Sequence, residues 1–163
     1  MDIIVTAPIA LKATAEQARE HREELCARYA PSYVRKALEI EKYAMARPET
    51  EAVASREITI GGVEAALWEL AEETKTGLYV ELRDIPIRQE TVEVFNTLDA
   101  DPYILESFGS WLLFVKDGAS VLARLRAQGY NEAAVIGYTT KEKKRTMIYS
   151  GVERFLLPPK RYI

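Results

Sequence analysis

The clearest pattern of apolar and polar positions lies between Arg56 and Gly77, in the sequence REITIGGVEAALWELAEETKTG. After two adjacent glycines, mostly apolar residues recur at the three- and four-residue spacing that forms one stripe along a helix face. Charged residues occupy most of the other positions. The stripe consists of Val63, Ala66, Leu67, Leu70, Ala71 and Thr74. This pattern predicts an amphipathic helix that begins at the glycine pair and ends at Gly77.

The first 57 residues predict a short strand, two helices and a loop. A β-branched run before Pro8 is typical of a strand. The sequence TAEQ has the spacing of a capping box and predicts the start of a helix, which Pro31 interrupts. The expected elements are a strand over Ile3–Thr6, helices over Thr14–Tyr29 and residues 32–46, and a loop over residues 47–57.

The rest of the chain alternates strands with helices. Short apolar runs predict strands, Ser120 is expected to cap a helix that Gly129 ends, and Ser150-Gly151 predicts a hairpin turn. The expected elements are strands over residues 78–82, 110–115 and 133–140, helices from Gln89 and from Ser120, and a hairpin over residues 145–157.

This order of elements predicts an α/β or α+β layered domain, with a mixed β-sheet covered by helices. We expect one domain over residues 1–163, in which residues 1–55 form a helical lead-in and residues 56–163 form an α/β core. The residues expected in that core are Leu67, Leu70, Leu112, Phe114, Val135 and Ile136.

Composition narrows the function classes. The chain has 163 residues and a net charge of −3, which gives no reason to expect nucleic acid or an anionic membrane as a partner. It contains one cysteine, Cys26, and one histidine, His21, so a tetrahedral zinc site and an intrachain disulfide are not expected. The N-terminus lacks the features of a signal peptide or membrane span, and we expect a cytoplasmic protein.

The glycine pair Gly61-Gly62 is the first candidate for chemistry. The unpaired N–H groups of a helix start attract anions, and glycine allows a ligand to approach the backbone closely. The surrounding sequence is neither a Walker A motif nor a GxGxxG motif. The pair is therefore interpreted first as a helix-start turn, with a phosphate-binding role as the alternative.

The segment DADPYILESFGSWLLFV is the second candidate. Asp101-Pro102 marks a turn, and a polar, glycine-containing loop then enters a buried strand. Loops at strand ends often carry ligand sites, and an ordinary connection is the alternative. The candidate residues of this loop are Glu106, Ser107, Gly109 and Ser110.

Other residues favour structural roles. Trp68 lies outside the main stripe, where it either widens the core or faces a partner. His21 shares a helix stripe with apolar residues and is expected to be packed, and Cys26 is expected to be a small buried side chain. The carboxylates Glu69, Glu72 and Glu73 indicate a solvated helix face, and KEKKR (residues 141–145) indicates a solvated turn.

From Arg56 to about Tyr138 the chain resembles the C-terminal domain of the aminoimidazole ribonucleotide (AIR) synthase superfamily, especially its hydrogenase-maturation branch. The family pattern of an acidic residue, a threonine and a glycine pair before a helix corresponds to Glu57, Thr59, Gly61 and Gly62. Further matches in order are Ile85-Pro86, Leu98 with Asp101-Pro102, Phe108-Gly109-Ser110, and Ala134 to Gly137.

The resemblance implies a domain that lines the substrate side of an ATP-dependent enzyme. Members of the superfamily usually carry an N-terminal ATP-binding domain, and this chain begins where that domain should end. ATP and Mg²⁺ are therefore implied only for a complete two-domain protein, and no cofactor is expected for the isolated chain.

Three departures bear on the chemistry implied by the resemblance. Glu57 replaces an aspartate, Ile60 replaces a basic residue common in the maturation proteins, and the terminus LLPPKRYI lacks their reactive cysteine.

Three functional hypotheses follow. The first is the C-terminal domain of an AIR synthase-related protein, inactive without an ATP-binding partner domain. The second is a stand-alone binding module for a small anion or a protein partner, and the third is an independent small enzyme. The sequence leaves a homodimer open, and the substrate is not identified.

Overall fold

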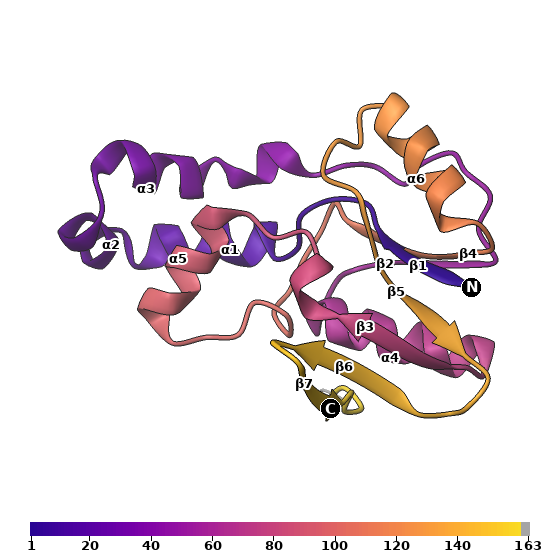
Figure 1. The fold of residues 1–163 in the computed structure, drawn as a ribbon. Coiled ribbons are helices and arrows are strands. Elements are labelled where there is room, and N and C mark those ends of the chain that lie inside the picture. The colour runs from indigo at the N-terminus through magenta and orange to yellow at the C-terminus, as the bar shows by residue number, and fades with distance from the viewer. Residues whose placement is uncertain (161–163) are drawn as a thin grey trace.

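The computed structural model describes residues 1–160 and shows a seven-stranded mixed sheet with helices on both faces (Figure 1). The predicted α/β layered fold class is confirmed. The strands are β1 (Asp2–Val5), β2 (Ala54–Glu57), β3 (Gly77–Glu81), β4 (Trp111–Val115), β5 (Ala134–Thr140), β6 (Arg145–Tyr149) and β7 (Val152–Phe155). The helices are α1 (Leu11–Glu20), α2 (Arg22–Arg28), α3 (Pro31–Leu38), α4 (Gly62–Thr74), α5 (Gln89–Leu98) and α6 (Gly118–Ala127), with 3₁₀ turns η1 (Ile40–Tyr43) and η2 (Leu82–Asp84).

The sheet has the strand order β2-β4-β1-β5-β3-β6-β7. Strand β1 pairs antiparallel with both β4 and β5, so the first strand of the chain lies in the interior of the sheet. Strands β3 and β6 pair in parallel, and β7 returns from β6 as an antiparallel hairpin. The order makes β2 one edge of the sheet and β7 the other.

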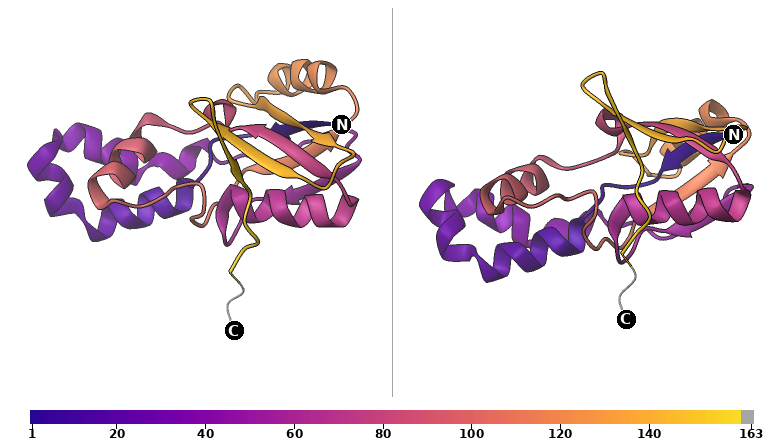
Figure 2. Two further views of the ribbon diagram at one scale, coloured as in Figure 1. Left: turned by 60° about the horizontal axis from the view of Figure 1, so that its bottom comes forward. Right: turned by 90° about the horizontal axis from the view of Figure 1, so that it is seen from below.

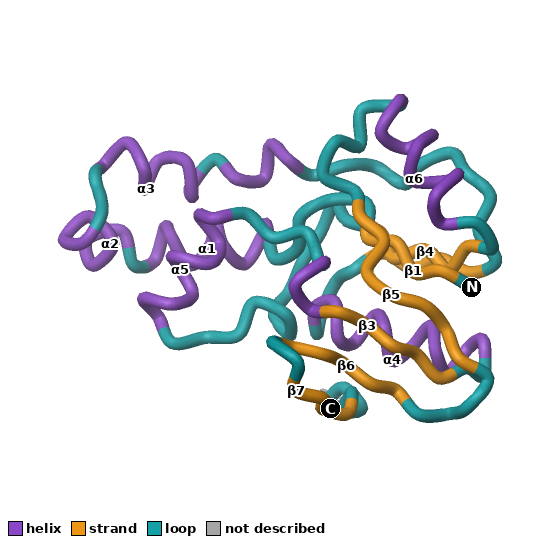
Figure 3. The backbone as a smooth tube through the Cα atoms, in the orientation of Figure 1, coloured by secondary structure: helices purple, strands orange, loops and turns teal. Residues whose placement is uncertain are grey.

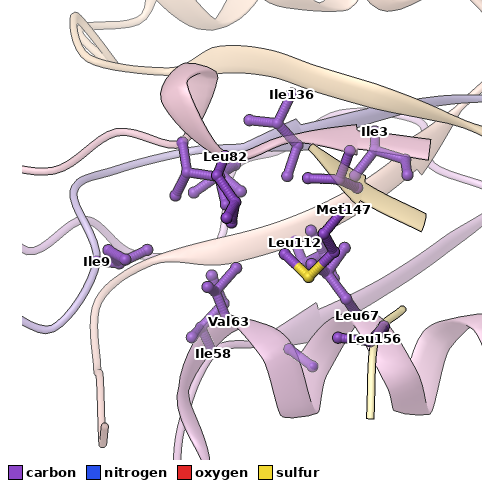
Figure 4. Close-up of a cluster of buried hydrophobic side chains, with 14 of the residues drawn as sticks. Ile3, Ile9, Ile58, Val63, Leu67, Leu82, Leu112, Ile136, Met147 and Leu156 are labelled. Carbon is purple, nitrogen blue, oxygen red and sulfur yellow. The ribbon is translucent and has the colours of Figure 1, made fainter. Parts of the chain in front are cut away.

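Helix α4 covers one face of this sheet and forms the main core. Its buried side chains Leu67 and Leu70 meet Ile3 from β1 and Leu112 from β4, all fully buried. Met147 of β6 belongs to the same cluster, and Figure 4 shows it beside Leu112 and Ile3. The periodicity of α4 therefore produces the largest apolar layer, because one helix face packs on alternate residues of several strands.

Helix α6 covers the opposite face over only part of the sheet. Ile4, Leu113 and Val115 pack there with Val121 and Leu125 of α6. Figure 2 shows α4 and α6 on opposite sides of the sheet, with the β6–β7 hairpin extending past them. Consecutive residues Ile3 and Ile4 thus enter different cores, as the period-two geometry of a strand requires.

Helices α1, α2, α3 and α5 form a helical lobe beside the sheet (Figure 3). Within it, the buried hydroxyls of Thr14 and Thr91 lie 2.9 Å apart and join α1 to α5. Because β1 belongs to the sheet and α5 belongs to the lobe, the spatial layers do not follow the predicted boundary at residue 55. Each layer is assembled from distant parts of the chain.

Several predicted helix boundaries were wrong. Helix α1 begins at Leu11, because Ala10 takes a left-handed conformation before it, and the Thr14 hydroxyl donates within the helix to the Ala10 carbonyl. His21 separates α1 from α2. Pro31 opens α3, where its missing N–H is tolerated.

Three further assignments also differ from the prediction. Lys75, in a left-handed conformation, ends α4, whereas Gly77 belongs to β3. Asp117, and not Ser120, caps α6 by accepting the Ser120 N–H at 3.1 Å. The predicted loop over residues 47–57 contains edge strand β2. The sequence did not indicate this strand, because its apolar and polar residues alternate only weakly.

Five of the six predicted core residues are buried, and Val135 is the exception. It is partly buried on the α6 face, whereas its neighbour Ile136 enters the main core. The hairpin turn at Ser150-Gly151 is confirmed, with positive φ values of 49° and 77° at the two residues. Such values suit a two-residue turn between antiparallel strands.

Leu67→Ala is expected to lower the free energy of unfolding by about 2–5 kcal/mol, because it leaves a cavity in the main core. Urea denaturation followed by circular dichroism measures the change. The matched control is Leu157→Ala, since Leu157 is exposed, and it should change stability little. Equal stability losses in the two variants would contradict the placement of α4 on the sheet.

Candidate functional site

The end of β2 leads directly into the candidate site. Glu57 pairs with Trp111 across the sheet, and the next N–H, from Ile58, donates to the Ser110 carbonyl at 2.9 Å. Ile58 is buried in the main core, whereas Ile60 is exposed. Within residues 1–160 the Glu57 carboxylate has no hydrogen-bond or ion-pair partner.

Gly61 and Gly62 form a tight turn with positive φ values of 88° and 71°. The Gly62 N–H donates to the Thr59 carbonyl at 3.0 Å, and the Glu64 N–H donates to the Tyr103 carbonyl at 3.2 Å. A Cβ atom on Gly62 would lie 2.5 Å from the Tyr103 carbonyl oxygen. The pair is therefore a helix-start turn against which another loop packs at backbone distance.

The loop over residues 103–110 joins this turn to the N-terminal segment. The Ser107 N–H donates to the Thr59 carbonyl at 3.2 Å, and its hydroxyl accepts the Ala10 N–H at 3.0 Å. The Ser110 hydroxyl donates to the Ala7 carbonyl at 2.6 Å. Both serines are fully buried, so their hydroxyls hold backbone segments together and do not face solvent.

Glu106 lies on the outer side of the same loop. Its carboxylate is 3.4 Å from the Lys12 ammonium, which also lies 4.4 Å from the centre of the Phe108 ring. The Gly109 carbonyl accepts the Met45 N–H at 2.7 Å, which connects the loop to the segment after η1. A shallow hollow of about 280 Å³ is lined here by Leu11, Lys12, Glu41, Ala44 and Phe108.

The structure thus brings the two predicted segments together. Residues 57–62 and 106–110 lie side by side, joined by the bonds from Ser107 to Thr59 and from Ile58 to Ser110. Their hydrogen bonds are mostly between protein backbone groups. The first N–H groups of α4 are accordingly engaged in part by carbonyls, which reduces the capacity of the helix start to hold an anion.

An ion pair between a buried carboxylate and a partly exposed guanidinium lies beside this turn and was not predicted from the sequence. Glu64 is only 8% exposed, and its carboxylate accepts both terminal nitrogens of Arg154 at 3.1 and 2.9 Å. These hydrogen bonds raise the pKa of Arg154 above its ordinary value. The pair fastens β7 to the first turn of α4. The helical periodicity placed Glu64 outside the apolar stripe, so its burial was not expected. No feature of the neighbouring sequence indicates that its partner, Arg154, lies 90 residues away.

Tyr103 lies in the same region. Burial raises the pKa of its phenol, and the carboxylate of Asp101 adds to the shift. The Asp101 carboxylate also accepts the Tyr103 N–H at 2.9 Å, which forms the turn predicted at Asp101-Pro102.

The other residues considered from the sequence have structural environments. Trp68 packs against the main core, and the Arg145 guanidinium lies 4.5 Å from the centre of its ring. The prediction of a packed His21 was wrong, since it is half-buried and 3.3 Å from Glu24. The prediction of a buried Cys26 was also wrong, because its side chain is exposed.

Three carboxylates of α4, those of Glu69, Glu72 and Glu73, are exposed, as predicted for a solvated face. Glu69 and Glu73 contact Arg56, and Glu72 contacts Arg145. Within residues 1–160, no cluster of three or more His, Cys, Asp or Glu side chains has an arrangement suited to a metal ion. No helix in that range is both long and apolar enough to cross a bilayer.

Residues 2–150 match the sequence profile of "AIR synthase related protein, C-terminal domain". The chain belongs to this family. The match covers strands β1 to β6, both helix layers and the candidate site, so the resemblance seen in the sequence is confirmed.

Two curated relatives come from the hydrogenase-maturation branch. The chain is 35% identical over 92 residues to carbamoyl dehydratase HypE of Rhodobacter capsulatus, an alignment covering 55% of this chain and 27% of that protein. It is 34% identical over 104 residues to a putative hydrogenase expression/formation protein of Methanocaldococcus jannaschii, which covers 62% and 31% respectively. The alignments therefore span about a third of each relative or less.

A solved structure of hydrogenase maturation protein HypE in complex with ATP shares the fold. The TM-score is 0.71 at 17% sequence identity, and the match covers 98% of this chain and 51% of that one. This AIR synthase-related chain thus spans about half the length of the solved relative.

Gly62→Val is expected to reduce the free energy of unfolding by at least about 3 kcal/mol, because it combines an unfavourable positive φ with overlap against the 103–105 carbonyls. Thermal and urea denaturation measure the loss. Gly129→Ala is the matched control: φ is +97°, yet no atom lies within 4 Å of a Cβ there. A loss no larger than that of the control would show that the close packing at Gly62 is wrong.

Arg154→Ala is expected to cost about 1–3 kcal/mol of folding stability, because it leaves the Glu64 carboxylate buried without its partner. Arg154→Ala combined with Glu64→Gln should recover part of this loss, since the remaining side chain is uncharged. The two single variants and the double variant form a cycle that isolates the interaction. Strict additivity would exclude the coupling inferred from the geometry.

Proposed function

We propose that this chain is the substrate-side domain of an ATP-dependent protein related to HypE, and that it works against an ATP-binding half, with no turnover of its own. The observation that carries the proposal is the family match over residues 2–150 to a domain defined as C-terminal. The likeness to half of a HypE chain solved with ATP supports it. The other half is either part of the same polypeptide or a separate chain.

In this proposal, the ATP-binding half packs at the mouth formed by the glycine turn and the 103–110 loop. Ile60 is 64% exposed and Ile104 is 51% exposed, and both flank Gly61-Gly62. Large apolar side chains exposed together often mark a surface that a partner covers. Glu57 and Thr59 lie at the same turn, where they would face the cleft between the halves.

Phosphoryl transfer needs donors to the triphosphate and a metal held by carboxylates. A helix start contributes only about 1 kcal/mol to anion binding, against roughly 8 kcal/mol for micromolar affinity. The N–H groups of Gly62 and Glu64 already donate to carbonyls. The proposal therefore assigns ATP and Mg²⁺ to the other half, in a cytoplasmic protein, and assigns the substrate-side wall to this domain.

A stand-alone binding module is the second candidate, in the form that binds a protein partner. The exposed pair Ile60 and Ile104 favours this form over an anion-binding module, because the helix start is partly occupied by backbone carbonyls.

Calorimetric titration with Mg-ATP tests the proposal. The 163-residue chain alone is expected to bind more weakly than millimolar, whereas the same chain joined to the ATP-binding half of a HypE relative is expected to bind in the micromolar range. Micromolar binding by the chain alone would overturn the assignment, and so would a joined protein that binds no ATP.

Ile60→Asp together with Ile104→Asp locates the contact between the halves. Association of this chain with the separate ATP-binding half is expected to weaken at least about tenfold, because two charges enter an apolar contact. Val53→Asp is the matched control, since Val53 is an exposed apolar residue on another segment. Equal affinity of the double variant and the control would place the interface elsewhere.

A further inference from the structure

A hollow lies on the same face of the sheet as α6, over strands β5, β3, β6 and β7, which run side by side (Figure 1). Tyr138, Tyr79 and Thr146 are cross-strand partners and therefore share this face. Helix α6 packs farther along the face, on β1 and β4. The hollow has a volume of about 440 Å³ and is lined by Leu78, Tyr79, Tyr138, Thr140, Lys141, Glu142, Lys144, Thr146 and Glu153.

Two parallel tyrosine rings contribute an aromatic surface to the hollow. The rings of Tyr79 and Tyr138 stack at a centroid distance of 5.3 Å with an interplanar angle of 14°. Tyr138 is 48% exposed, so part of its ring is accessible to a third planar group. Aromatic rings prefer such offset stacks, and a planar ligand would extend the pair in the same geometry.

Thr146 is a buried polar residue whose side chain has no partner in the fold. It is only 5% exposed, and it lines the hollow. Within residues 1–160, its hydroxyl forms no hydrogen bond with another protein group, whereas the hydroxyl of the neighbouring Thr140 donates to the Glu142 carbonyl. Buried hydroxyls in proteins normally have a partner. A polar group of a ligand in the hollow would supply one.

Charges of both signs meet at the hollow. Lys141, Glu142 and Lys144 lie on the turn between β5 and β6, and Glu153 lies on β7. In the part of the chain that the structure describes, none of these four side chains forms an ion pair. The formal charges of the lining cancel. A simple anion would be attracted by the lysines and repelled by the glutamates, and a simple cation the reverse, whereas a molecule that carries both charges satisfies both sets.

We propose that this hollow binds a small aromatic zwitterion, of the class of the free aromatic α-amino acids. The ring of the ligand stacks on Tyr138, its carboxylate faces Lys141 and Lys144, and its ammonium faces Glu142 and Glu153. The volume of the hollow lies within the range of small-molecule sites in proteins. This inference does not depend on the proposed function, because the lining contains no residue of the glycine turn or of the 103–110 loop.

Titration of the ¹⁵N-labelled full chain with L-tryptophan, followed by NMR, tests the proposal. The amide signals that shift are expected to belong to residues 77–81 and 138–146. The expected dissociation constant is about 0.1–1 mM, which is the affinity that a ligand of this size reaches at the efficiency typical of small molecules. Tryptamine, which lacks the carboxylate, and indole-3-propionate, which lacks the ammonium, are each expected to bind at least about tenfold more weakly.

Two single variants test the aromatic and the buried polar contact. Tyr138→Ala is expected to weaken tryptophan binding at least about tenfold, because the stacking surface is lost. Thr146→Val is expected to weaken it about three- to tenfold without lowering the thermal stability, because it removes a hydroxyl that has no partner in the fold. Tyr149→Ala is the matched control, since Tyr149 is an exposed tyrosine on β6 outside the lining, and it should leave binding unchanged.

Two double variants test the charges separately. Lys141→Gln with Lys144→Gln is expected to abolish the preference for tryptophan over tryptamine and to retain the preference over indole-3-propionate. Glu142→Gln with Glu153→Gln is expected to do the opposite, because it removes the groups that face the ammonium. Circular dichroism verifies that every variant is folded.

Four outcomes would overturn the proposal. They are an absence of shifts with tryptophan at saturation, shifts confined to another surface, an analogue that binds the wild-type chain as tightly as tryptophan does, and a folded Tyr138→Ala variant that binds no more weakly than the Tyr149→Ala control. The calorimetric result with Mg-ATP is a separate measurement, so this proposal and the proposed function fail independently.

Discussion

Helix α4 can lie where it does only because Gly62 has no side chain. At that residue the loop over residues 103–105, which follows it by 41 to 43 positions in the sequence, passes at backbone contact, with the Tyr103 and Leu105 carbonyls facing the space that a Cβ atom would fill. The same contact supplies the acceptor for the Glu64 N–H. The main core, the route of the 103–110 loop and the mouth of the candidate site all follow from this close approach.

The buried serines extend this contact to the start of the chain. Ser107 and Ser110 bind backbone groups of residues 7–10, and those residues lead from β1 into α1. An unpaired backbone group buried here would cost stability, so the hydroxyls satisfy groups that no strand partner reaches. The glycine turn, the loop and the N-terminal segment consequently form one connected backbone assembly, with exposed apolar side chains on its outer surface.

Local physics explains which parts of this structure were predictable. The stripe of α4 and the hairpin at Ser150-Gly151 depend on neighbouring residues, and both were predicted correctly. Strand β2 is a half-buried edge strand whose apolar and polar residues do not alternate, so the sequence did not predict it. Thr14 was expected to cap a helix, but its hydroxyl donates to the Ala10 carbonyl inside that helix. The candidate site divides in the same way. The local sequence and the resemblance singled out its glycines and serines as candidates, but the hydrogen-bond partners of the Ser107 and Ser110 hydroxyls lie about 100 residues away and have no local signal.

The interior position of β1 has a consequence for how the chain folds. Strand β1 is synthesised long before its partners β4 and β5, which begin at residues 111 and 134. The Met1 carbonyl likewise accepts a hydrogen bond from the N–H of Thr139, a residue that is synthesised much later. Pairings this distant carry a high loop-closure cost and slow folding. On the ribosome, the apolar residues of β1 remain unpaired until most of the domain has emerged, so this segment is exposed to aggregation for most of the synthesis of the domain.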